Sequence, residues 1–314
     1  MHLPFCWQSD RDKSLSRSGH IRRFARILAL TLWRRKTITL ATPIQPETAA
    51  PVAQRAIGRL HLRAKRRGAR SVIGGLRQEG SVKALFPKVR GAALDCVFLN
   101  TAGGLTGGDD MRLDVAAEEG AHITVSSQAA ERAYRSIDGA AGNVVVDLSV
   151  GAGGCIHWLP QETILFDHAA LSRTLRVDLA PDATALLVEP IIFGRRAMGE
   201  DVQTLSLRDH WRVRRDGKLV FADAIRLQGD AKDIMSGLAT GQGAGAVATV
   251  LLAGPQAAAC AAKLDLQGLS GASLIADDLL LVRLLAEDGY HLRRQLWPVM
   301  TALSNVPIPR VWSL

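Results

Sequence analysis

Four glycines and two aspartates lie close together in the stretch LNTAGGLTGGDD, residues 99–110. A glycine-rich loop binds phosphate when a lysine follows it and a helix begins at its end. Here Asp109 and Asp110 follow instead, and two carboxylates repel a phosphate. The next residues alternate between apolar and polar, which predicts a strand. We therefore interpret residues 103–108 as a glycine turn, and a nucleotide-binding enzyme using this loop is the alternative.

Carboxylates inside apolar runs are the second chemical feature. Glu162 lies in LPQETILF, Glu189 lies in LLVEPIIFG, and Glu200 ends GRRAMGE. A buried carboxylate costs several kcal/mol unless it is paired or hydrated. These acids therefore predict either salt bridges, for which Arg195 and Arg196 are candidates, or a polar interior that contains water.

Asp109 leaves two roles open. Its carboxylate can cap the glycine turn by accepting backbone N–H groups, or it can face such a polar interior. Because a short acidic side chain next to a turn commonly bonds to its own backbone, we favour the cap.

Metal and nucleophile motifs are absent from the sequence. It contains no HExxH, no GxSxG and no pair of histidines four residues apart. His157, Glu162 and Asp167 would meet only if the fold brought them together, so we expect transient contact with a divalent ion and no dedicated metal cage. The cysteines are too widely spaced for a zinc knuckle and predict buried free thiols in a reducing compartment, here the cytoplasm; they are Cys6, Cys96, Cys155 and Cys260.

The elements that must position these residues are mostly strands. Alternation with a period of two predominates between residues 55 and 255 and predicts about a dozen short strands. Asp216-Gly217 is the strongest hairpin signal. Helical periodicity appears mainly late in the chain, where Pro298 predicts a kink or a restart. We predict a mainly β, elongated, multi-stranded and largely antiparallel architecture with a few short helices, mostly C-terminal.

Residues 1–51 differ in composition from the rest. The first fifty residues hold nine Lys or Arg against three acids, so most of the chain's net charge of +9 lies there. The apolar run 27–33 is followed at once by three basic residues, unlike a secretory signal. Three prolines then predict a linker. We expect 1–51 to be a disordered basic extension with a Pro-rich linker, and 52–314 to be one β domain.

Two partner classes are disfavoured by this distribution. A nucleic-acid footprint should map to a folded face, and these basic residues lie in the extension instead. Residues 236–262 carry no charge, but they are rich in glycine and poor in large apolar side chains. They predict a turn, a buried strand in AVATVLLAG and the start of a short helix. The chain is therefore not expected to bind nucleic acid or a membrane.

Five stretches in order are similar to those of one family. They are LNTAGGLTGGD (99–109), SSQAAERAYRS (126–136), WLPQETILFD (158–167), EPIIFGRRAMGE (189–200) and VPIPRVW (306–312). Over residues 52–314 the chain resembles the urease accessory protein UreD (UreH) family. That resemblance implies a mainly β, elongated fold and a non-enzymatic maturation factor.

The same resemblance implies partners and a cargo. Such a factor binds apo-urease and acts with UreF and the GTPase UreG, and nickel is thought to pass to urease through an internal channel. Oxygen ligands hold hydrated cations weakly, which suits transit. We therefore expect transient Ni2+ and no tightly bound cofactor. The residues expected to line or support such a channel are Asp109, Glu162, Glu189 and Glu200.

Overall fold

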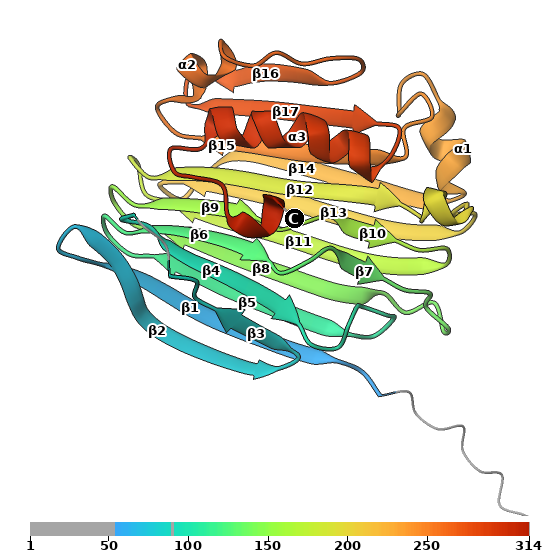
Figure 1. Cartoon of the computed structure of the whole chain (residues 1–314), viewed down its shortest axis with the longest axis horizontal. Helices are drawn as coiled ribbons and strands as arrows, with labels where there is room; N and C mark the ends of the chain where they lie inside the picture. Colours follow the sequence, from blue (N-terminus) through green and yellow to red (C-terminus); the bar gives the residue numbers. More distant parts are fainter. Residues whose placement is uncertain (1–53, 89–90, 314) are drawn as a thin grey trace, which may run out of the picture. The chain divides into compact units, whose positions relative to one another are not determined.

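The computed structural model describes residues 54–88 and 91–313, which form two β-sheets and a set of short helices (Figure 1). The basic extension and linker predicted for 1–51 lie outside the described residues. The prediction of a mainly β protein is confirmed, and the α-helices of the described part all lie late in the chain. They are α1 (Ala231–Ser236), α2 (Ala257–Ala261) and α3 (Gly289–Leu303).

Sheet A has seven strands. In spatial order they are β14 (Lys218–Gly229), β13 (Leu205–Arg215), β11 (Ala169–Leu179), β8 (Gly142–Val150), β5 (Asp110–Ala117), β1 (Ile57–Arg67) and β2 (Arg70–Gly80). An antiparallel hairpin closes each edge of the sheet. The β13–β14 turn is the predicted Asp216-Gly217, in which both residues have positive φ, as a tight hairpin of this kind requires.

Sheet B has ten strands. Its main path is β16 (Gly271–Ala276), β17 (Leu279–Ala286), β15 (Ala246–Ala253), β12 (Thr184–Phe193), β9 (Cys155–Leu159), β6 (His122–Ser127), β4 (Leu94–Asn100) and β3 (Val82–Leu85). Two short strands, β10 (Thr163–Leu165) and β7 (Glu131–Ala133), extend from β12. The segment AVATVLLAG forms buried β15, as predicted, and no described helix is long and apolar enough to cross a membrane.

In the middle of the molecule the chain winds in successive turns, and each turn passes from a strand of sheet A to a strand of sheet B. Strand β5 of sheet A leads to β6 of sheet B, β8 leads to β9, and β11 leads to β12. The corners that join these strands stack on one another; they are residues 118–121, 151–154 and 180–183. The first residue of each later corner donates its N–H to the last residue of the sheet A strand one turn earlier. Strands of successive turns therefore pair in parallel within each sheet. The two sheets thus combine parallel and antiparallel pairs rather than being largely antiparallel.

Two layers of apolar contact hold this arrangement together. The larger core lies between the sheets, and the smaller lies between the other face of sheet B and helices α2 and α3. The central strands of sheet B are consequently buried on both faces, which explains their nearly continuous apolar sequences. Helix α3 runs through Pro298 as one element, and its buried residues are Leu292, Leu296, Val299, Met300 and Leu303.

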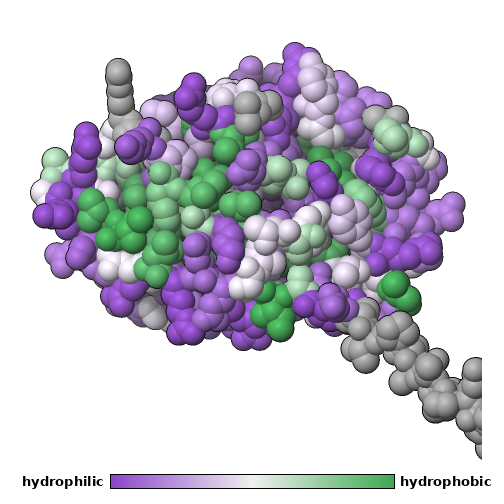
Figure 2. Space-filling model, turned by 60° about the horizontal axis from the view of Figure 1, so that its bottom comes forward, coloured by the Kyte–Doolittle hydropathy of each residue, from purple (hydrophilic) through white to green (hydrophobic). Residues whose placement is uncertain are grey.

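The edge formed by β1, β2 and β3 carries exposed apolar side chains. Figure 2 brings this end of the molecule forward and shows hydrophobic residues between strongly polar ones. Ile73 and Leu76 on β2 are 40% and 41% exposed, and Leu85 on β3 is 51% exposed. Charged neighbours such as Arg77 and Glu79 lie on the same strand, and charge on an edge strand discourages uncontrolled pairing.

Candidate functional site

A cavity of about 350 Å3 lies between the sheets, and four of the five family-like stretches line it. Exposed residues, among them Gly103, Gln128 and Arg132, form one end of its wall. Arg173 and Glu189, both buried, form another part of the wall. The cavity therefore connects the surface near the glycine loop with charged groups in the inter-sheet core.

The charged groups form a triad centred on Arg173. Its guanidinium bonds to Asp209 through Nε and Nη2, at 3.1 and 2.5 Å, and to Glu189 through Nη1 at 2.5 Å. Trp158 Nε1 donates to the other oxygen of Glu189 at 2.8 Å. Burial raises the pKa of Glu189, and the adjacent guanidinium opposes that rise. With all three groups charged, the triad carries one net negative charge in the core.

The strand register explains how these three residues meet. Arg173 on β11 and Asp209 on β13 are directly paired in sheet A, and Glu189 reaches them from β12 in sheet B. Each occupies an inward position of its strand, where the neighbouring alternate residues are apolar, such as Leu171 and Leu207. Sequence reasoning found Glu189 but missed the other two; a charge at an apolar position of a period-two strand is the signal that finds them.

Asp109 caps the glycine loop. Its Oδ1 accepts from Ala56 N at 2.7 Å and its Oδ2 accepts from Thr106 N at 2.8 Å. Although Asp109 is buried, it is not among the residues that line the cavity. Of the two roles considered for this aspartate, the structure shows the cap.

The glycines of the loop serve close packing. A Cβ on Gly104 would lie 2.3 Å from the Tyr134 ring, and one on Gly107 would lie 2.2 Å from Ser136 Oγ. Strand β5 follows the loop, so the loop does not lead into a helix N-terminus. The loop thus packs tightly against the segment 131–140 and lacks the geometry of a phosphate cradle.

Glu162 lies on the helical side of sheet B, not in the cavity wall. Arg293 of α3 donates to it twice, from Nε at 2.9 Å and from Nη2 at 2.7 Å. The C-terminal segment joins this region, because Gln161 Nε2 donates to Val311 O and Trp312 Nε1 donates to Leu159 O. The fifth family-like stretch is thereby fixed beside the third.

Glu200 is half-buried and lines two other hollows, not the inter-sheet cavity. Its Oε2 accepts from Arg195 Nε at 2.8 Å, which is one of the two salt bridges considered from the sequence. The hydrogen bond from Arg195 lowers the pKa of Glu200. Of the four acids named from the sequence, only Glu189 lines the inter-sheet cavity.

Glu131 is an acid of the cavity wall that sequence reasoning did not single out. It is half-buried at the start of β7, and it accepts from Asn100 Nδ2 at 3.2 Å and from Arg132 N at 2.8 Å. Burial raises its pKa. It was missed because it lies in a polar stretch, although that stretch is one of the five family-like ones.

The wall therefore offers carboxylate oxygens without a closed cage. Glu131 and Glu189 both accept hydrogen bonds, and each carboxylate has acceptor capacity beyond them. Oxygen ligands of this kind suit a hydrated divalent cation that is held weakly. The arrangement can attract and orient such a cation.

These features define a mainly β protein whose chain winds between two sheets, with a cavity between them that charged side chains help to line. The family model described as UreD urease accessory protein matches residues 56–313. A urease accessory protein UreD of Roseobacter denitrificans is 44% identical over 270 residues, which cover 85% of this chain and 98% of the relative. Those of Rhizobium leguminosarum bv. viciae and Sinorhizobium medicae are 46% and 42% identical, over 83% and 85% of this chain and 96% and 100% of theirs.

The chain therefore belongs to the UreD urease accessory protein family. The resemblance given by the five short stretches is confirmed over nearly all of the described residues.

Proposed function

We propose that this protein is a non-enzymatic urease maturation factor of the cytoplasm, which binds apo-urease and acts with UreF- and UreG-type partners. It helps to deliver nickel to the urease active site, and the inter-sheet cavity is the part of the route that this chain supplies. The observation that carries the proposal is the connection from exposed Gly103 and Arg132 to the buried Arg173–Glu189 pair in one cavity of a UreD-family chain.

The chemistry of the wall supports transit rather than storage. Its acidic ligands are separate carboxylates that already accept hydrogen bonds, so no preformed oxygen cage competes with delivery. The nucleotide-binding alternative finds no such support, because the loop 103–108 leads into a strand and its glycines pack against protein atoms.

The test joins assembly and activation in one experiment. Urease is expressed with its accessory proteins and with this chain as wild type, Glu131→Gln or Glu189→Gln. Each variant removes one negative charge from the cavity wall while keeping the side-chain shape. We expect co-purification with urease subunits and a UreF-type partner to be unchanged, while activation at limiting nickel falls about tenfold.

A matched control is Glu119→Gln. Glu119 is exposed at the corner between β5 and β6 and does not line the cavity, so activation should stay at the wild-type level. Equal activation by all three variants would refute the cavity as a nickel route. Failure of the wild-type chain to co-purify with urease would refute the maturation role itself.

A further inference from the structure

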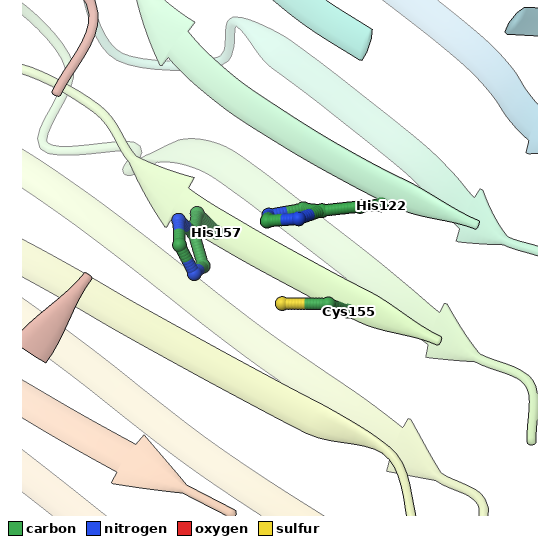
Figure 3. Close-up of side chains that lie close together, drawn as sticks. All are labelled: His122, Cys155 and His157. Carbon is green, nitrogen blue, oxygen red and sulfur yellow. The ribbon is translucent and has the colours of Figure 1, made fainter. Parts of the chain in front are cut away.

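Three side chains with metal-binding atoms converge on the face of sheet B that points away from sheet A. His122 begins β6, Cys155 begins the neighbouring parallel strand β9, and the two residues are directly paired. His157 lies two positions after Cys155 and so projects from the same face. Figure 3 shows the two rings and the thiol lying close together.

The three ligand atoms can share a single ion once the side chains rotate. One ligand atom from each residue lies within 4.8 Å of the others, and the two imidazole rings meet edge to face with centroids 4.8 Å apart. Around a four-coordinate zinc-like ion, nitrogen and sulfur ligand atoms lie about 3.4–3.6 Å apart. Side-chain rotations that move these atoms by about 1 Å therefore close the set.

The polar atoms of this cluster are incompletely satisfied. Nε2 of His122 is buried without a hydrogen-bond partner, and the same holds for the hydroxyls of Thr124 and Ser126 further along that face of β6. A buried polar atom without a partner is unfavourable, and it calls for an explanation such as a bound water or ion. Nδ1 of buried His157 lies 3.4 Å from Ser304 Oγ, the kind of contact that orients a metal-binding ring.

We propose that His122, Cys155 and His157 bind one borderline-soft divalent transition-metal ion, of the Zn2+ or Ni2+ type, with a fourth position open to water. Imidazole and thiolate together select such ions over Mg2+ and Ca2+. Binding releases the thiol proton of Cys155 to solvent, so one proton leaves for each ion bound. The site lies on the opposite face of sheet B from the cavity and does not depend on the proposed nickel route.

The protonation states agree with this role. Burial lowers the pKa of His122 to about 4 and that of His157 to about 3, so both rings are neutral ligands at neutral pH. Burial also raises the pKa of Cys155 to about 12, so the thiol ionises only when the metal replaces its proton.

The test is a titration of the metal-free full-length chain with Co2+ under reducing conditions, followed by absorption. We expect one equivalent to give a thiolate-to-cobalt charge-transfer band and the visible bands of a four-coordinate ion, both displaced by one equivalent of Zn2+. Cys155→Ser should abolish the charge-transfer band. His122→Gln should weaken Co2+ affinity at least tenfold while retaining the fold.

The other cysteines provide matched controls. Cys96→Ser and Cys260→Ser replace buried free thiols outside the cluster. Cys6→Ser replaces the fourth cysteine of the sequence. All three should keep the band. The proposal is overturned if the band persists in Cys155→Ser, disappears in Cys6→Ser, or is missing from the wild type. If Cys155→Ser does not fold, wild-type affinity in folded His122→Gln overturns it equally.

Discussion

The two faces of sheet B carry buried polar clusters of opposite character. On the face toward sheet A, Arg173 joins Glu189 and Asp209, and each charged group has a hydrogen-bonding partner of opposite charge. On the other face, His122 and Cys155 meet without any charged partner, and Nε2 of His122 bonds to nothing in the described part of the chain. Every charged group of the first cluster is paired within the protein, whereas the second cluster contains a buried nitrogen without a partner in the described residues.

The sharpest way to break this comparison is to remove the centre of the charged cluster. Arg173→Met leaves Glu189 and Asp209 buried without their cation, and breaking a buried ion pair costs about 3–5 kcal/mol. Urea unfolding of the variant should show that loss. The triple variant Arg173→Met, Glu189→Leu, Asp209→Leu should recover most of it, because no charge is then left unpaired. Equal instability of the two variants would mean that packing, and not charge, holds this site together.

The neutral cluster should respond to metal instead. At a free Zn2+ concentration of about 100 times Kd, the wild type should gain about 2.7 kcal/mol of unfolding free energy. Cys155→Ser should gain none, and Cys260→Ser should gain as much as the wild type. Addition of a chelator should return the wild type to its metal-free stability. A zinc effect of the same size in Cys155→Ser would place the ion elsewhere.

A substitution in the neutral cluster should change stability in the direction opposite to Arg173→Met. His122→Phe replaces an unsatisfied buried imidazole by an apolar ring of similar size, and removing an unpaired buried polar atom is neutral or favourable. We expect the metal-free variant to be more stable by about 1 kcal/mol in urea unfolding, and insensitive to Zn2+. A marked loss of stability would show that the ring makes a polar contact essential to the fold.

Local features of this fold could be predicted from the sequence, and long-range ones could not. Alternation predicted the strands, and Asp216-Gly217 predicted its hairpin, because both depend on neighbouring residues. A short turn has the same sequence pattern whether it joins two paired strands of one sheet or two strands of different sheets. The pattern therefore does not predict which strands pair. At the corner 180–183, for example, β11 and β12 lie in different sheets, so the turn there does not join an antiparallel pair.

The same limit applies to the sites. Glu189 was named as a candidate site residue because an acid inside an apolar run is unusual locally. Its position in the cavity wall follows from the fold. The pairing of His122 with Cys155 depends on the register between β6 and β9, which no spacing motif encodes. The expectation of no dedicated metal cage therefore rested on the absence of a local sequence motif. Neighbouring strands of a sheet can bring metal-binding side chains together without such a motif.

The surface pair of Glu200 and Arg195 extends the comparison to a third setting, in which the effect should be smallest. Arg195 lowers the pKa of Glu200, so the charged form is favoured in the folded state. Its contribution is therefore present above the unfolded pKa of about 4.3 and lost as pH falls through the lower folded value. The stability difference between wild type and Glu200→Gln should be constant above about pH 5.5 and vanish in stronger acid.

Denaturant unfolding of both proteins across this pH range measures that difference directly, because every other titrating group is common to them. The difference should be smaller than any change expected above, since Arg195 is half exposed and water screens the pair. A difference as large as that of Arg173→Met would mean that exposure does not separate the two pairs. A difference that grows toward acid would contradict the lowered pKa, because the folded state would then bind the proton more readily than the unfolded chain.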